Sequence, residues 1–205
     1  MAEVTALIDY GAGNLRSVAN ALRAAGGDGV VVTADPALVR TADRIVLPGV
    51  GAFRACVDAL RAVPGLVEAM TERVQSGGVP FLGICVGMQL LATRGIEFGV
   101  TDGLDWICGE VRRIEPADAT IKVPHMGWND VAPHGGSLIV PGEAYFLHSY
   151  HFVPDQASDI AAITDHGGGL VAAVARDTVL GVQFHPEKSQ DYGLALLARF
   201  LGWKP

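Results

Sequence analysis

The sequence has few cysteines. Its 205 residues contain three, Cys56, Cys85 and Cys108. An odd and sparse set of this kind does not form a disulfide framework, and no C-x-x-C pair indicates a zinc site. A cysteine outside such motifs is most often a small buried hydrophobic residue. We expect this for Cys56 and Cys108, which have no chemistry-bearing neighbours in the sequence.

Long apolar runs and an excess of basic residues are also absent. The longest apolar stretches, such as residues 45–48 and 79–82, are strand-sized, far short of the roughly 20 residues that a membrane-spanning helix needs. The net charge of -7 argues against a general nucleic-acid-binding protein. No basic stretch precedes an apolar one near the first residue, so no signal peptide is indicated and cytoplasmic residence is the default expectation.

What the sequence does contain is a large apolar fraction. Half of the residues are apolar and 18% are charged, which is enough to bury a sizeable core. In the first half, strand and helix signals alternate, and this alternation favours a mostly parallel sheet covered on both faces. The strand-like segments are 4–9, 30–33, 44–47 and 80–84, and the helical ones are 14–25, 53–63, 66–75 and 86–92.

The second half changes character. Between residues 108 and 182 it consists mainly of short β-like segments separated by clusters of glycine and proline. These segments are 109–114, 128–131, 144–148, 160–164, 170–174 and 178–184, and a helix is expected over 192–200. No linker or repeat separates the halves. We therefore expect one domain over residues 1–205: an α/β fold with a mostly parallel central sheet flanked by helices and an antiparallel β extension.

A glycine-rich turn at residues 11–13 follows the first strand. A dinucleotide-binding fingerprint would place a third glycine at position 16, where the sequence has Arg16, and no acidic residue is clearly placed some twenty positions later. We reject a dinucleotide site and expect no cofactor and no metal. The glycines are better explained by a tight strand-to-helix turn or by a contact with a partner.

The third cysteine, Cys85, lies in a different setting. Residues 83–87 (GICVG) follow a buried strand and precede a helix, which is the nucleophile-elbow pattern with cysteine in the serine position. Such an elbow holds its nucleophile on a sharp, strained turn at the carboxyl end of the sheet. The start of the following helix favours a thiolate. Gln89 is expected one helical turn further on, near the same face. A buried structural cysteine at a strand end would give a similar local pattern.

Two residues near the end of the chain provide a base and an acid. His185 and Glu187 follow the last predicted strand, and Pro186 favours an extended conformation for His185. In an extended chain, residues two apart point to the same side, so the imidazole and the carboxylate can approach one site. We expect His185 to act as base for Cys85 and then as acid for the leaving amine, with Glu187 fixing its tautomer.

A glycine-containing loop, residues 48–51 (PGVG), ends another strand. An elbow enzyme takes one oxyanion donor from the residue after the nucleophile, here the Val86 N–H, and the other from a neighbouring strand-to-helix loop. The glycines on both sides of Val50 allow its N–H to be presented and to change orientation. An ordinary turn would contain the same residue types. However, the nucleophile, the histidine and the acid follow one another in this order along the chain, and with the loop they form a coherent triad layout.

These residues resemble the class I (triad) glutamine amidotransferases over essentially the whole chain. Within that family, the sequence is similar to the glutaminase subunits of imidazole glycerol phosphate synthase. The cysteine and His-Pro-Glu motifs mark the family, and the first and fourth of the following segments mark the subunit. The segments are 9–14 (DYGAGN), 48–51 (PGVG), 83–89 (GICVGMQ), 123–129 (VPHMGWN) and 183–189 (QFHPEKS).

The resemblance implies an activity and site residues. The activity is hydrolysis of glutamine to glutamate and ammonia, with Cys85 as nucleophile, His185 as general base and acid, and Glu187 as its orienting partner. The remaining implied residues form two sets. The substrate contacts are Gly49, Gly51, Gln89, Glu97 and the segment His148, Ser149 and Tyr150, and the partner contacts are Asn14, Trp128, Tyr145 and Lys188.

The resemblance also implies a partner, the cyclase (synthase) subunit, which is a (β/α)₈ barrel through which ammonia passes. A glutaminase running alone would waste glutamine, so low activity is implied until this partner binds. We hypothesise that the Gly49–Val50 peptide is the switch, because the Val50 N–H must face the active site to complete the oxyanion hole.

Three alternatives remain at this point. The chain could be a glutaminase that serves another synthase, such as those for GMP, anthranilate or pyridoxal phosphate, although residues 125–129 argue against this. It could be a non-catalytic regulatory subunit, which an intact Cys85, His185 and Glu187 disfavour. It could also be a cysteine hydrolase that acts on other γ-glutamyl amides.

Overall fold

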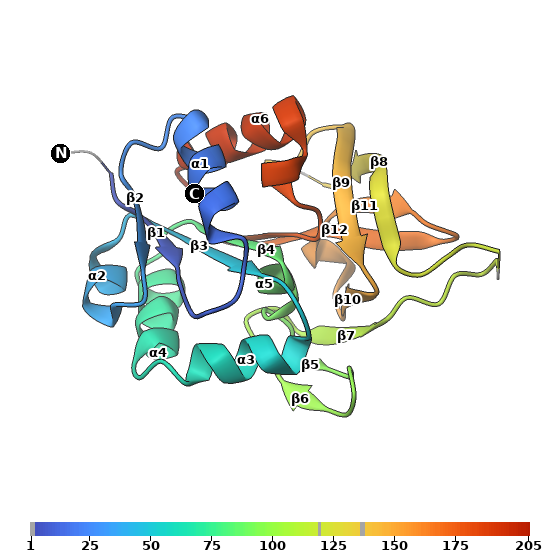
Figure 1. The fold of residues 1–205 in the computed structure, drawn as a ribbon, viewed down its shortest axis with the longest axis horizontal. Coiled ribbons are helices and arrows are strands. Elements are labelled where there is room, and N and C mark those ends of the chain that lie inside the picture. The colour runs from blue at the N-terminus through green and yellow to red at the C-terminus, as the bar shows by residue number, and fades with distance from the viewer. Residues whose placement is uncertain (1–2, 119, 136–137) are drawn as a thin grey trace.

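A nine-stranded sheet runs through the computed structural model, which describes residues 3–118, 120–135 and 138–205 (Figure 1). Five adjacent strands pair in parallel, and four further strands extend the sheet in antiparallel pairs, so the predicted fold class is confirmed. In spatial order the strands are β2 (Val30–Thr33), β1 (Thr5–Ile8), β3 (Arg44–Gly49), β4 (Phe81–Cys85), β13 (Val179–Val182), β12 (Gly169–Arg176), β11 (Ile160–Asp165), β8 (His125–Pro133) and β9 (Gly142–His148).

Helices cover both faces of the parallel part (Figure 1). On one side lie α1 (Leu15–Ala24) and α6 (Gln190–Leu201); on the other lie α2 (Pro36–Thr41), α3 (Phe53–Arg61) and α4 (Leu66–Thr71), which a π-helical turn, Glu72–Ser76, continues. The short helix α5 (Val86–Gln89) follows β4 directly. None of the described helices is long and apolar enough to cross a membrane.

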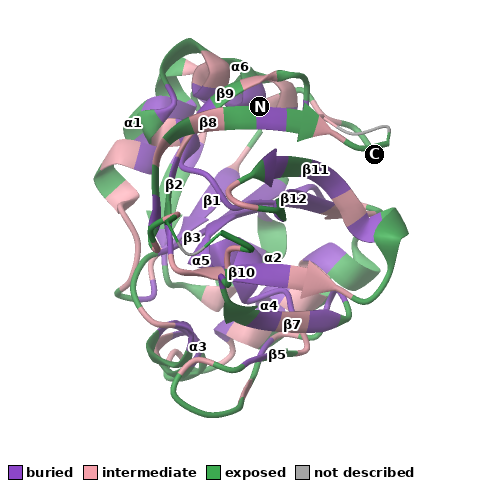
Figure 2. Cartoon of the chain, turned by 90° about the vertical axis from the view of Figure 1, so that its right-hand side faces the viewer, coloured by how far each residue is buried: buried purple, intermediate pink, exposed green. Residues whose placement is uncertain are grey.

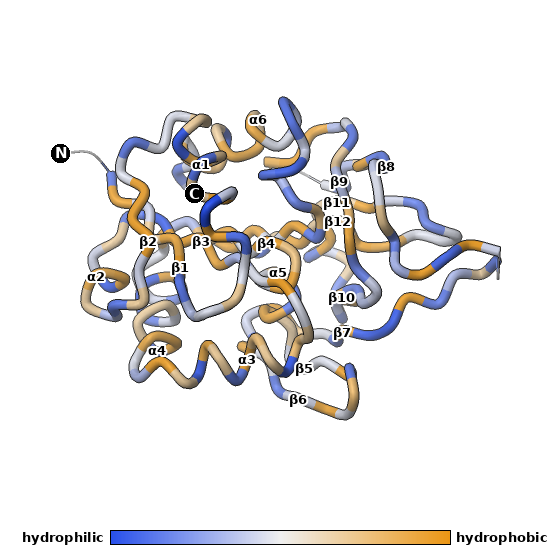
Figure 3. The backbone as a smooth tube through the Cα atoms, viewed as in Figure 1, coloured by the Kyte–Doolittle hydropathy of each residue, from blue (hydrophilic) through white to orange (hydrophobic). Residues whose placement is uncertain are grey.

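The two parts of the sheet differ in burial because they differ in what covers them. All residues of β1, β3, β4 and β13 are buried, as expected for parallel strands with a helical layer on each face. Apolar residues accordingly concentrate along these strands (Figure 3). In contrast, few residues of β8 are buried, and exposed residues recur along it (Figure 2), because one face of an antiparallel extension can meet water.

A second sheet of four strands lies beside the first. Its order is β10 (Tyr150–Pro154), β7 (Gly109–Arg113), β5 (Arg94–Gly95) and β6 (Thr101–Asp102). The sequence pattern predicted β7 but not the other three. Two of these have only two residues, too few to show an alternation. The third, β10, follows β9 after a single residue, Ser149, so the two strands look like one segment in the sequence.

Two further differences from the sequence-based expectations have local reasons. Helix α2 was not predicted, although its start carries a helix signature: the Asp35 carboxylate accepts a hydrogen bond from the Ala37 N–H at 2.9 Å, and Pro36 follows as the first helical residue. The prediction that Cys108 is buried is wrong, because the thiol is exposed. Trp106 and Ile107 occupy the core positions of this turn and leave Cys108 facing outward.

The elbow at the end of β4 depends on very close backbone packing. A Cβ atom on Gly87 would lie 1.9 Å from the Leu47 carbonyl oxygen of β3, and one on Gly83 would lie 2.6 Å from the Gly87 oxygen. Neither glycine has a positive φ. The glycines of the elbow are therefore required for the contact between α5 and the sheet rather than for an unusual backbone conformation.

This packing predicts that Gly87→Ala destabilises the fold. Because β3 and α5 must separate to admit the methyl group, we expect the free energy of unfolding to fall by about 2–3 kcal/mol or more, measured by urea denaturation. Gly169→Ala is the matched control: its Cβ meets nothing within 4 Å, so a change within about 0.5 kcal/mol is expected. Equal stability of the two variants would contradict the packing argument.

Candidate active site

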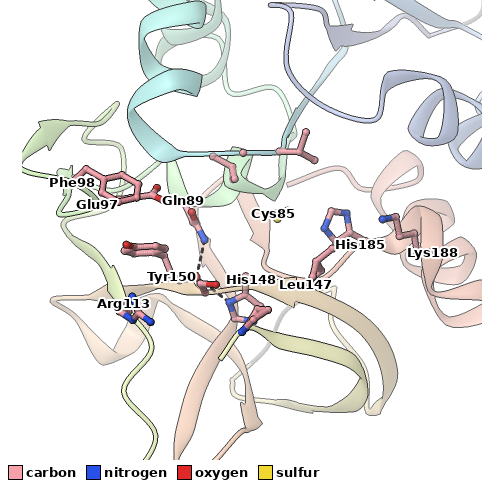
Figure 4. A pocket seen from close by; sticks show the side chains of 15 residues that line it. Cys85, Gln89, Glu97, Phe98, Arg113, Leu147, His148, Tyr150, His185 and Lys188 are labelled. Atoms are coloured by element: carbon pink, nitrogen blue, oxygen red, sulfur yellow. Dashed lines mark hydrogen bonds between the residues drawn. The ribbon is translucent and has the colours of Figure 1, made fainter. Parts of the chain in front are cut away.

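A cavity opens at the carboxyl ends of the central parallel strands, where open α/β sheets generally bind ligands. Its volume is about 520 Å³. Most of the predicted site residues line it, together with several that were not predicted (Figure 4). The lining residues are Val50, Gly51, Cys85, Val86, Gln89, Glu97, Phe98, Arg113, Pro124, Leu147, His148, Ser149, Tyr150, His185 and Lys188.

Cys85 has the strained backbone that the elbow pattern predicts. It ends β4 with φ 55° and ψ −113° and is 4% exposed. A positive φ is uncommon for a residue with a Cβ atom and persists only where the surrounding structure enforces it. The helix that follows is shorter than predicted and ends at Gln89 instead of extending to residue 92.

His185 connects the cysteine to a carboxylate. The imidazole lies close enough to Cys85 for the sulfur to affect its pKa, and its Nδ1 lies 2.9 Å from the Glu187 Oε1. Both the His185 and Glu187 side chains are buried. Burial lowers the pKa of His185, but the hydrogen bonds and negative charges of Cys85 and Glu187 outweigh it and raise the pKa to about 10. The arrangement therefore favours an imidazolium next to the sulfur.

A buried glutamine that was not predicted also contacts the sulfur. The Gln183 Nε2 donates to Cys85 Sγ at 3.7 Å, and its Oε1 accepts from the Gln89 Nε2 at 2.9 Å. Gln183 is fully buried. It precedes His185 by two residues, and the same alternation that groups His185 with Glu187 could have identified it.

The PGVG loop lies next to the elbow, with Gly49 paired to Cys85 in the register of β3 and β4. Two side chains hold the carbonyls on either side of the Gly49–Val50 peptide. The Tyr10 hydroxyl donates to the Pro48 oxygen at 2.8 Å, and the Cys56 thiol donates to the Val50 oxygen at 3.3 Å. Cys56 is buried as predicted, and its bond to the Val50 oxygen places it beside the loop.

The opposite wall of the cavity comes from the loop after α5 and from the β9–β10 junction. The Glu97 Oε2 accepts from the Phe53 N–H at 2.8 Å, which ties this loop to the start of α3. His148, Ser149 and Tyr150 connect β9 to β10 and line the cavity. Phe98 was not predicted; it is 87% exposed, with a positive φ, at the mouth of the cavity.

Three of the four predicted partner contacts lie together. The rings of Trp128 and Tyr145 are 6.2 Å apart at 79°, and the Lys188 Nζ lies 5.8 Å from the centre of the Tyr145 ring. Lys188 also lines the cavity. The fourth residue, Asn14, stands immediately before α1, which packs against the 3₁₀ turn Pro186–Lys188. Within the described ranges, no group of three or more His, Cys, Asp or Glu residues is placed to hold a metal ion.

Comparison with known proteins gives consistent matches. The family model described as Glutamine amidotransferase class-I matches residues 6–202. The chain is 60% identical to the imidazole glycerol phosphate synthase subunit HisH of Zymomonas mobilis, covering 98% of this chain and 96% of the relative. It is 54% identical to the HisH subunit of Caulobacter vibrioides, covering 99% and 100%. A solved glutamine amidotransferase structure aligns with a TM-score of 0.76 at 19% identity, covering 98% and 100%, and shows the fold alone.

The site geometry predicts that Cys85 controls the charge of His185. In Cys85→Ala, burial still lowers the pKa of His185 while the contribution of the sulfur is lost. We expect the pKa to fall from about 10 by about 1–3 units, the size of a close charge interaction, as measured by NMR titration of the imidazole. Cys108→Ala, the same change at an exposed thiol, should leave the titration unchanged. A His185 pKa that is equal in both variants would refute the assignment.

Proposed function

The chain belongs to the class I glutamine amidotransferase family, and from this membership we propose that it is the glutaminase subunit of an imidazole glycerol phosphate synthase. It hydrolyses glutamine to glutamate and ammonia and supplies the ammonia to the cyclase subunit, which makes imidazole glycerol phosphate and AICAR in histidine biosynthesis. One observation carries the proposal: a strained, buried Cys85 lines the same cavity as His185, which is paired with a buried Glu187.

In the proposed mechanism, Cys85 attacks as a thiolate. His185 holds the proton taken from the thiol, and Glu187 keeps the imidazole oriented through its Nδ1. The sulfur adds to the side-chain amide carbon of glutamine, and the carbonyl oxygen becomes an oxyanion. His185 then passes its proton to the departing nitrogen, and ammonia leaves behind a γ-glutamyl thioester. A water molecule, deprotonated by His185, attacks this thioester and releases glutamate and the free cysteine.

The oxyanion needs donors that are in place before it forms. We assign the Val86 N–H, directly after the nucleophile, and the Val50 N–H, in the adjacent loop. Because Tyr10 and Cys56 hold the carbonyls of Pro48 and Val50, rotation is confined to the Gly49–Val50 peptide between them. This anchoring supports the hypothesis that the peptide is the switch.

The partner face is proposed to be the surface that contains Trp128, Tyr145 and Lys188, with Asn14 beside it, and the partner is proposed to be a (β/α)₈ barrel. Trp128 is 48% exposed on β8, a large apolar side chain of the kind that anchors interfaces. Lys188 belongs both to this face and to the lining of the cavity, so ammonia released at Cys85 would have a short route to the partner.

The alternative assignments receive less support. A glutaminase of another synthase would share the fold, as the solved structures titled for a GMP synthase subunit and for PurLQS do at 20% and 18% identity. The relatives named HisH, at 47–60% identity over nearly the full chain, favour the histidine pathway. A non-catalytic subunit would have no need for the Cys85–His185–Glu187 arrangement, and competition between glutamine and other γ-glutamyl amides would identify a different hydrolase.

The proposed function predicts partner-dependent glutamate release. We expect the wild type to hydrolyse glutamine slowly alone and much faster with the cyclase subunit and its nucleotide ligand. Cys85→Ala should lose about 10⁴-fold or more of this activity, as triad nucleophiles generally do, and Cys108→Ala should retain it. Without stimulation, the histidine-pathway assignment fails while the glutaminase assignment stands. Equal activity of the two alanine variants would overturn the glutaminase assignment.

The switch hypothesis makes a separate prediction for Gly51→Pro. Gly51 has φ 101°, whereas proline requires about −65°, so the loop cannot keep its path around Val50. We expect the stimulated kcat to fall about 10²–10³-fold, the cost of losing an oxyanion donor. Alkylation of Cys85 by iodoacetamide, which forms no oxyanion, should keep its wild-type rate. Undiminished stimulation in Gly51→Pro would count against the switch.

A further inference from the structure

Two buried histidines that the proposed mechanism does not use lie side by side at the glutamine cavity, and one of them, His148, lines it. His125 and His148 are opposite each other in the register of β8 and β9, with His125 Nδ1 3.0 Å from His148 Nε2. They are 3% and 7% exposed. Their neighbour Asn129, four residues along β8, contacts His125 Nε2 at 3.0 Å. These three side chains form a chain of hydrogen bonds whose direction can be deduced.

The direction is set by Asn129. Its Nδ2 donates to the Asp165 carbonyl oxygen at 2.7 Å, and its Oδ1 accepts from the Asp130 N–H at 2.9 Å. A carbonyl oxygen can only accept and a backbone N–H can only donate, so each of these two contacts fixes the orientation of the Asn129 amide. Both contacts require the same orientation. The second N–H of this Nδ2 must therefore be the donor to His125, which makes His125 Nε2 the acceptor.

The tautomers of both histidines follow from this starting point. With Nε2 of His125 as acceptor, the proton of the neutral ring is on Nδ1 and is donated to His148 Nε2. His148 must then hold its own proton on Nδ1, and this nitrogen lies 2.9 Å from the Tyr150 carbonyl oxygen, which can only accept. The hydrogen-bond direction deduced from Asn129 therefore agrees with the direction that the Tyr150 carbonyl, as an acceptor, requires at the other end of the chain.

The chain continues into the wall of the cavity (Figure 4). The Tyr150 oxygen also accepts from the Gln89 Nε2 at 2.9 Å, and the second N–H of Gln89 donates to the Gln183 Oε1. Both donors of Gln89 are therefore used within the protein, and its Oε1 remains as an acceptor. Gln183, oriented in the same way, presents its own N–H to Cys85 Sγ.

The surroundings keep both histidines neutral and in place. The His125 ring is stacked between Phe146, at 4.6 Å, and His166, at 4.2 Å. Burial, and next the nearby His166, lower the pKa of His125 to about 4. Burial is also the main cause that lowers the pKa of His148, to about 3. Each ring therefore carries a single proton at neutral pH, as the chain requires.

We propose that His125, His148 and Asn129 are positioning residues for glutamine hydrolysis: their hydrogen bonds hold the Tyr150 carbonyl in place, and this carbonyl in turn holds the Gln89 amide with its Oε1 left as an acceptor for the α-ammonium group of the substrate. This inference rests on the proposed function. Gln89 rotated end for end would offer N–H groups instead, and these repel an ammonium group, which can only donate.

The test is a series of substitutions at His125, assayed as full chain with the cyclase subunit. His125→Phe keeps the stacked ring and removes both hydrogen bonds. We expect it to raise KM for glutamine about tenfold, the typical effect of losing an oriented buried hydrogen bond, with kcat within about threefold of wild type. His125→Asn, whose amide nitrogen can stand in for Nδ1–H, should recover most of the KM. His134→Phe makes the same change at an exposed histidine and should leave KM unchanged.

The readouts separate the possible outcomes. A purely structural role of His125 would reduce the fraction of active protein, which lowers kcat and leaves KM unchanged, and this result would overturn the inference. ¹⁵N NMR of the wild type should find both rings protonated on Nδ1, and an Nε2–H tautomer at either histidine would also overturn it. If the wild type hydrolyses glutamine and the KM of His125→Phe is unchanged, this inference is refuted and the proposed function stands. A wild type that does not hydrolyse glutamine refutes the proposed function and this inference with it.

Discussion

The close contact between the start of α5 and the end of β3 determines the geometry of the whole site. Gly87 lies against the Leu47 carbonyl with no room for a Cβ atom, and this contact forces the strained turn at Cys85 and sets it beside Gly49. The two proposed oxyanion donors, the N–H groups of Val50 and Val86, therefore come from backbone segments in direct contact. The close contact at Gly87 leaves the elbow little room to move, so movement is confined to the Gly49–Val50 peptide between the held carbonyls of Pro48 and Val50.

The sequence was most informative where the structure is local or regularly periodic. Alternation of strand and helix signals predicted the parallel sheet, and the elbow motif predicted the strained turn at Cys85. The directions and contacts of individual side chains could not be predicted in this way. The Cys56 thiol, in the first turn of α3, reaches the Val50 oxygen six residues earlier, and Cys108 faces outward because its two neighbours occupy the core. His125 meets His148 only through a strand pairing that no short-range pattern encodes.

The side chains of Gln89, Gln183, His125 and His148 are buried, and this burial gives their orientation its importance. In a medium of low dielectric constant, a hydrogen bond is strong and an unpaired polar group is costly, so a buried network tends to have one arrangement. From Asn129 to Cys85, each donor in this network meets an acceptor. In contrast, the Glu187 Oε2 and His151 Nδ1 have no hydrogen-bond partner in the part of the chain that the structure describes.

The two roles proposed for strand β8 lie on its opposite faces. Alternate residues point to opposite sides of a strand: His125 and Asn129 face inward, whereas Met126 and Trp128 are 65% and 48% exposed. The outward residues can therefore be substituted, by divergence or by protein engineering, to fit a different partner surface. The inward residues need not change. Substitutions on one face of a single strand would then change the enzyme that a glutaminase serves and leave its glutamine-binding residues unchanged.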